Sequence, residues 1–92
     1  MKSIYKYQFP IMDDISIDMP LGAKILTCQI QHKTPKIWAI VDTDPSWVET
    51  VRNFKLFGTG HKMPDNIDNL SYISTFLAAD DNLVFHLFEV IE

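Results

Sequence analysis

Short runs in which apolar and polar side chains alternate constrain the fold of this chain more than any other feature. In residues 14–19, Ile15, Ile17 and Met19 alternate with the polar residues Ser16 and Asp18. A period of two residues is typical of a half-buried β-strand, because successive side chains of a strand point to opposite faces. Clusters rich in Pro, Gly, Asp and Asn separate this run from others like it. The pattern therefore predicts short strands joined by turns.

The same pattern predicts strands over residues 3–9, 14–19, 23–31, 36–41, 47–57, 71–77 and 83–91. Residues 36–41 are apolar on both faces, which predicts a central strand. Residues 47–57 also fit one face of a helix, but their β-branched and aromatic side chains favour a strand. We expect no more helix than a turn near Pro45 or Asp65, and a long loop over residues 58–69.

These expectations define a fold class. About seven short, largely antiparallel strands with little helix predict a mainly β domain, either a sandwich or a partly open barrel. A chain of 92 residues cannot enclose two separate cores, so we expect a single domain over residues 1–92. Because so small a core gives modest stability, we also expect a homo-oligomer.

Composition limits the partners. The net charge of −4 and the lack of a basic run argue against duplex nucleic acid, although a few local donors can still bind a small anion. No window is apolar enough to cross a membrane, so we expect no membrane partner. The single cysteine, Cys28, cannot form an internal disulfide, which favours the cytoplasm.

The segment Gly58-Thr59-Gly60-His61 is the loop that most resembles a binding site. Two glycines that can adopt positive φ let successive backbone N–H groups converge on an anion, and Thr59 adds a hydroxyl. The segment is neither a Walker loop nor a dinucleotide fingerprint, because the lysine, the third glycine and the following helix are missing. A glycine-stabilised turn explains the same residues, and the pattern favours that explanation.

His61 and His86 are the candidate imidazoles for binding an anion. Strand alternation places His86 on the face of Val84, Phe88 and Val90, where it could also serve as a structural histidine. No Ser, Cys or carboxylate stands at a spacing that would complete a catalytic set, and the histidines and Cys28 are scattered. We therefore assign no catalytic residue, no metal site and no cofactor, and we expect a protein that is not an enzyme.

Several aromatic residues and one arginine are further candidates for a binding site. The amphipathic aromatics are Tyr5, Tyr7, Trp38, Trp47 and Tyr72. Most of these rings are expected to lie in the core. Trp47 and Tyr72 are the side chains that could stack on a base, and Trp47, expected to be exposed beside its polar loop, could equally anchor a protein contact. Arg52, the only arginine, could fork onto a phosphate or a carboxylate, although an exposed position on a strand is the simpler expectation.

The chain resembles a family of short, uncharacterised bacteriophage and prophage proteins. The resemblance covers nearly the whole chain and depends on Met19-Pro20 with Gly22-Ala23-Lys24, on Gly58-Thr59-Gly60-His61 and on His86 with Phe88-Glu89, among other segments. It implies a phage context, a β-rich fold and, if phage-encoded, the host bacterial cytoplasm. It supplies no catalytic residues.

Three functions follow as hypotheses. The first is an anti-defence module that sequesters a nucleotide-like immune signal without cleaving it. Its ligand-binding residues would be Gly58, Thr59, Gly60, His61, Trp47, Tyr72, His86 and Arg52. The second is an interaction module that inhibits or redirects a host protein. The third is a small hydrolase that uses paired carboxylates, although the Asp pairs lie in turn-like segments where Asp bonds the backbone.

Overall fold

A computed structural model describes residues 1–44 and 46–91. Seven strands follow one another along the chain: β1 (Lys2–Gln8), β2 (Asp14–Pro20), β3 (Lys24–Gln31), β4 (Thr34–Asp42), β5 (Glu49–Gly58), β6 (Leu70–Ala78) and β7 (Leu83–Val90). The ambiguous segment 47–57 is a strand from Glu49 onward, and Asp65 lies in a bend without helix. The expected helical turn near Pro45 lies outside the described residues.

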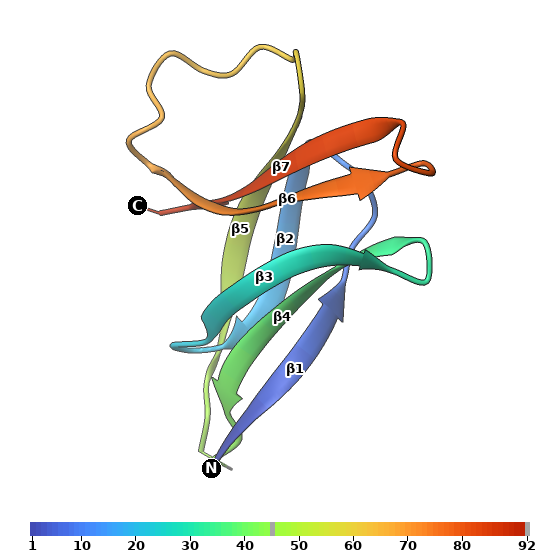
Figure 1. Cartoon of the computed structure of the whole chain (residues 1–92). Coiled ribbons are helices and arrows are strands. Elements are labelled where there is room, and N and C mark those ends of the chain that lie inside the picture. Colours follow the sequence, from blue (N-terminus) through green and yellow to red (C-terminus); the bar gives the residue numbers. More distant parts are fainter. Residues whose placement is uncertain (45, 92) are drawn as a thin grey trace.

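The strands form two antiparallel sheets (Figure 1), which confirms the mainly β prediction. One sheet has the order β1-β4-β3, with β4 in the centre as predicted, and the other has the order β2-β5-β7-β6. In Figure 1, β1, β4 and β3 lie side by side in the lower part of the view, with β6 and β7 above them. The long loop after β5 projects beyond the strands.

The core lies between the inner faces of the two sheets. Along β4, Ile37, Ala39 and Val41 are almost completely buried, while the intervening Trp38 and Ile40 are half-buried on the outer face. The other sheet contributes Phe54, Leu56, Phe76 and Leu87 among its buried residues. Burial of alternate side chains is what holds each strand in register, because a shift by one residue would expose this entire set.

Two links join the sheets beside the core. At the neighbouring edges of β3 and β6, the Ser74 hydroxyl accepts a hydrogen bond from the Cys28 backbone N–H at 2.9 Å and lies 2.8 Å from Thr27 Oγ1. Arg52 of β5 donates to both carboxylate oxygens of Glu89 on β7, and its Nη1 donates to the Ala23 carbonyl at 2.7 Å. The second link fastens the turn between β2 and β3 to the four-stranded sheet.

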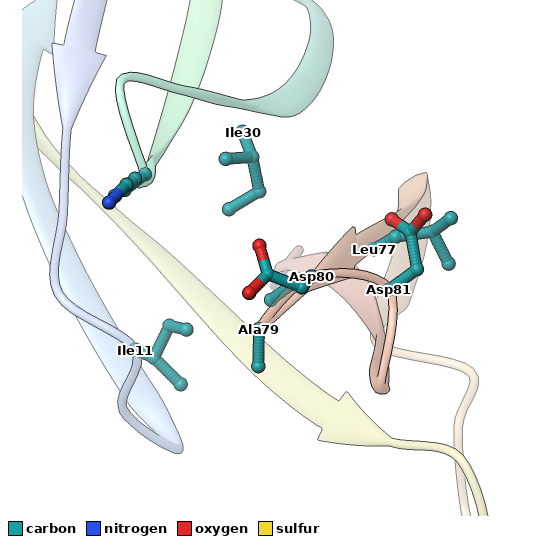
Figure 2. A pocket seen from close by; sticks show the side chains of 8 residues that line it. Ile11, Ile30, Leu77, Ala79, Asp80 and Asp81 are labelled. Atoms are coloured by element: carbon teal, nitrogen blue, oxygen red, sulfur yellow. The ribbon is translucent and has the colours of Figure 1, made fainter.

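Two of the turns between strands use left-handed backbone without glycine. His32 and Lys33 join β3 to β4 with φ of 52° and 66°, and Ala79, Asp80 and Asp81 follow β6 with φ of 51°, 55° and 69°. Figure 2 shows the depression beside the second turn, with Ile11 and Ile30 around the space and the Asp80 carboxylate directed toward it. Asp81 lies on the other side of the turn in the same view.

The molecule is thin. Its principal extents are 43 × 33 × 16 Å and its Cα radius of gyration is 13.8 Å. The smallest extent leaves room for two sheets and one shared layer of side chains, because packed sheets lie about 10 Å apart.

Within the described residues there is no helix long and apolar enough to cross a membrane.

Candidate functional site

His86 is the centre of a row of polar side chains on the outer face of the four-stranded sheet. It is half-buried on β7, opposite Phe57 of β5 on one side and Thr75 of β6 on the other. Its Nε2 lies 2.8 Å from Thr59 Oγ1 and its Nδ1 lies 2.9 Å from Thr75 Oγ1. Three segments that are distant in sequence therefore meet at one imidazole ring.

The row continues from Thr75 to Tyr72, whose hydroxyl lies 2.7 Å from Thr75 Oγ1. A neutral imidazole has one N–H donor and one acceptor nitrogen, whereas hydroxyl groups can donate or accept. The threonine hydroxyls can therefore satisfy His86 in either neutral tautomer or as the cation. This row, Thr59–His86–Thr75–Tyr72, is called the polar row below.

The rings of Phe57 and Phe88 accompany the polar row on the same face. Phe88 lies between Tyr72 and Phe57, with ring centroids 5.6 Å and 5.8 Å away and interplanar angles of 68° and 75°. Such edge-to-face contacts hold the rings in a fixed arrangement. Tyr72 remains 58% exposed, so its ring is accessible to a ligand.

Cationic side chains flank this aromatic group beside Phe57. A depression of about 240 Å³ is lined by Asp13, Asp14, Lys55, Leu56, Phe57, His61 and Lys62. Lys55 points to the same face as Phe57, and its Nζ forms an exposed ion pair with Asp14 at 2.6 Å. An anion here would meet the Lys55 and Lys62 ammonium groups and the exposed His61 ring, and also the carboxylates of Asp13 and Asp14.

The predicted loop of residues 58–61 forms a tight turn. Gly60 has φ of +88°, whereas the importance of Gly58 is steric, because an added Cβ would lie 2.8 Å from His61 Cε1. The Thr59 amide donates to the Val84 carbonyl and the His61 amide donates to the Gly58 carbonyl, each at 3.0 Å. With these two amides committed inside the protein, the loop offers a ligand mainly its Thr59 and His61 side chains.

The structure separates two of the predicted binding residues from the polar row. Trp47 lies before β5, at the opposite end of that strand from Thr59; it is 39% exposed, as expected, and packs edge-on against Tyr5 with ring centroids 6.3 Å apart. The Arg52 side chain is only 21% exposed because it bonds Glu89 and the Ala23 carbonyl, which corrects the expected exposed position. Its hydrogen bonds with Glu89 raise the pKa of Arg52, and its fork is occupied by that carboxylate.

No pattern in the sequence marks Thr75, Phe57, Phe88 or Lys55 as a ligand-binding residue. Strand alternation does place His86 with Phe88 and Val84, and this expectation is confirmed. The approach of Thr75 and Phe57 depends on the register between β5, β7 and β6, for which no local signal exists.

The other reactive groups lie elsewhere. Burial raises the pKa of the Cys28 thiol to about 12, so this side chain stays protonated in the core. Over residues 1–44 and 46–91, no cluster of three His, Cys, Asp or Glu side chains is arranged to hold a metal ion.

Comparison with known proteins gives a family and no function. No curated protein and no solved structure matches the chain. A family model described as a domain of unknown function (DUF7352) matches residues 1–92. The chain therefore belongs to the DUF7352 family.

Proposed function

We propose that this protein binds a nucleotide-like ligand on the outer face of β5, β7 and β6 and holds it without cleaving it. The observation that carries the proposal is the position of the polar row, with its exposed Tyr72 ring, beside the rings of Phe57 and Phe88. Exposed aromatic rings on a sheet can stack on a base, and hydroxyl and imidazole groups can hydrogen-bond the base edge or a phosphate.

The charges near Phe57 complete this binding mode. A phosphate could contact Lys55 and Lys62 while the base stacks near Tyr72 and Phe88. Both nitrogens of His86 meet neutral hydroxyls rather than a carboxylate, which favours binding over proton abstraction. In this proposal Gly58 and Gly60 shape the turn, and Thr59, His61, Tyr72 and His86 contact the ligand.

The biological role within the proposal is anti-defence. In a phage-encoded protein, holding a nucleotide immune signal would withdraw it from its receptor in the host bacterial cytoplasm. The free concentration of a signal falls when a protein in excess binds it tightly, so no cofactor or catalytic turnover is needed.

Thermal unfolding with a panel of linear and cyclic nucleotides tests the proposal. A ligand that binds only the folded state raises the melting temperature, and we expect a rise with at least one nucleotide. Tyr72→Ala and His86→Ala should each weaken that ligand about tenfold or more, whereas Trp47→Ala, far from the polar row, should bind as the wild type does. A panel without any rise would refute nucleotide binding. Recovery of a cleaved nucleotide from the denatured complex would refute holding without cleavage.

A second candidate function is docking of an apolar segment of a host protein on the same face. Val51, Tyr72 and Leu77 are 57%, 58% and 48% exposed on the outer side of the four-stranded sheet. These side chains are spread over the face from β5 to β6, and exposed apolar side chains on one face are typical of interaction surfaces. Leu77→Glu separates the two functions, because it should abolish host-protein docking and leave nucleotide binding intact.

A further inference from the structure

Over the part of the chain that the structure describes, two strands have an edge that faces no other strand. In the sheet orders β1-β4-β3 and β2-β5-β7-β6, the edges of β3 and β6 lie beside each other and are linked through Ser74. Among the described strands, β1 and β2 have no neighbour on their outer sides. Such edges present free backbone donors and acceptors that another strand can pair with.

The hydrogen-bond pattern identifies which residues face outward on β1. Thr43 donates to the Met1 carbonyl and Phe9 donates to the Pro35 carbonyl, so the odd-numbered residues of β1 bond β4. In an antiparallel pair the intervening residues direct their backbone groups away from the partner. The free edge of β1 is therefore formed by Lys2, Ile4 and Lys6.

The same reasoning applies to β2. Leu56 donates to the Asp13 carbonyl and Leu21 donates to the Val48 carbonyl, so the odd-numbered residues of β2 bond β5. The free edge is formed by Asp14, Ser16 and Asp18. Pro20, which has no N–H, also falls at an outward position, where the missing donor leaves no gap in the β2–β5 ladder.

The two edges are complementary in charge and spacing. Lys2 and Lys6 are four residues apart on one edge, and Asp14 and Asp18 are four residues apart on the other. Antiparallel pairing of β1 with β2 of another copy sets Lys2 opposite Asp18, Ile4 opposite Ser16 and Lys6 opposite Asp14. All three pairs are then hydrogen-bonded pairs of the new ladder, with their side chains on one face.

Pairing of like edges is disfavoured. Two β1 strands paired antiparallel about Ile4 would set Lys2 against Lys6, and two β2 strands paired about Ser16 would set Asp14 against Asp18. Charge is also distributed unevenly over the whole molecule, with basic residues gathered near β1 and acidic residues elsewhere. Five of its eight basic residues lie on β1, β3, β4 and the connecting turn, and ten of its twelve acidic residues lie in the other described segments. The basic residues are Lys2, Lys6, Lys24, Lys33 and Lys36.

We propose that β1 of one copy pairs antiparallel with β2 of a second copy through the Lys2–Asp18 and Lys6–Asp14 contacts. The contact joins unlike surfaces, so repeated contacts build a ring or an open chain. Exposed Ile4, at 59%, becomes covered by the partner strand. Lys6 and Asp14 also bond Gln31 and Lys55 within one copy, and both of these bonds are exposed to solvent.

Charge reversal on each edge tests this pairing by sedimentation equilibrium over a range of protein concentration. The wild type should exceed its monomer mass of 10.6 kDa, whereas Lys2→Glu/Lys6→Glu and Asp14→Lys/Asp18→Lys should each remain monomeric. An equimolar mixture of the two variants should assemble again, because every contact between unlike variants restores opposite charges. The control variant Lys24→Glu/Lys33→Glu changes the net charge by the same amount as Lys2→Glu/Lys6→Glu, but at positions away from both edges. It should assemble as the wild type does.

A backbone substitution gives an independent readout. Ile4→Pro removes an outward N–H that β4 does not use, so it should block assembly and leave the melting temperature of the monomer nearly unchanged, while Ile4→Thr should still assemble. Circular dichroism melts confirm that each variant is folded. A wild type that is monomeric at every concentration overturns the proposal. It is likewise overturned by assembly of the lysine-reversed variant or by a mixture that stays monomeric.

Discussion

Gly58 and Gly60 stand two residues apart in the turn after β5 and require glycine for different reasons. Gly60 has a left-handed backbone, with φ of +88°, that most L-residues adopt only at a cost. Gly58 instead lies under the His61 ring, where a Cβ would come within 2.8 Å of Cε1 and 2.9 Å of Nδ1. Because His61 is exposed and can rotate away, a side chain at residue 58 should move His61 and leave the backbone in place.

The backbone at residue 60 gives a stability prediction. Gly60→Ala should lower the free energy of unfolding by about 1 kcal/mol, because alanine pays for the positive φ that glycine adopts freely. Gly60→Asn should lower the free energy of unfolding less than Gly60→Ala does, since asparagine tolerates a positive φ better than alanine. Urea denaturation of the three proteins measures the differences. Equal stability of the alanine variant would mean that the turn can adopt negative φ.

Cys28 gives a reactivity prediction. Its pKa of about 12 and its complete burial leave little thiolate at pH 8, and the thiolate is the form that attacks disulfide reagents. Ellman's reagent should therefore react with Cys28 in urea and should scarcely react in the folded protein. Rapid reaction under native conditions would show that the core opens near β3.

Between elements, the contact of β3 with β6 depends on one hydroxyl. Ser74 is 5% exposed and accepts the Cys28 amide, a donor that the β3–β4 ladder leaves to the other edge of β3. A buried N–H without a partner costs about 1–3 kcal/mol. The side chain of Ser74 therefore replaces a backbone ladder at the place where the two sheets meet.

Replacement of Ser74 tests this link. Ser74→Ala should lower the free energy of unfolding by about 1–3 kcal/mol and speed hydrogen exchange at the Cys28 amide, because the hydrogen bond is lost. Thr27→Val is the matched control, since it removes the second hydroxyl and leaves the bond to the Cys28 amide. An unchanged exchange rate in Ser74→Ala would show that the amide has another acceptor.

Strand positions could be predicted because alternation and turn chemistry are local. The apolar pattern on both faces of residues 36–41 identified the central strand, and β-branched and aromatic residues identified β5. Arg52 shares its alternation with the buried Phe54 and Leu56, so an inward position could have been inferred as well. The general rule that charged side chains lie outside predicts an exposed Arg52 instead. The sequence does not indicate that Glu89 is its partner.

The candidate site was only partly predictable. The side-chain chemistry of Thr59, Tyr72 and His86 makes them candidates, but they meet because His86 lies opposite Thr75 and Phe57. A bulge on β6 between Tyr72 and Ser74 changes the register just before that point, and a sequence gives no direct sign of such a shift. Trp47 was chosen by the same chemistry and lies at the other end of β5.

At the scale of the whole molecule, the Arg52–Glu89 ion pair fastens distant segments together. The side chains of Arg52 and Glu89 are 21% and 14% exposed, and the guanidinium also holds the Ala23 carbonyl. Removal of one partner from such a pair leaves a partly buried charge that water solvates poorly.

Removal of Arg52 alone should therefore lower the free energy of unfolding more than removal of both Arg52 and Glu89. Arg52→Met should lower the free energy of unfolding by about 2 kcal/mol, and Arg52→Met/Glu89→Leu should recover much of that loss, because no unpaired charge remains. A double-mutant cycle from denaturant unfolding measures the coupling. This account would be contradicted if the double variant lost as much free energy of unfolding as Arg52→Met and Glu89→Leu lose in sum.

The thin shape of the protein affects how its size will look in solution. A compact chain of this length has a radius of gyration of about 12 Å, whereas the Cα radius here is 13.8 Å and the shortest extent is 16 Å. A plate experiences more friction than a sphere of equal mass, so a single copy should elute early from a sizing column and resemble a small oligomer. Its nuclear spin relaxation should likewise depend on the direction of each N–H bond relative to the plate.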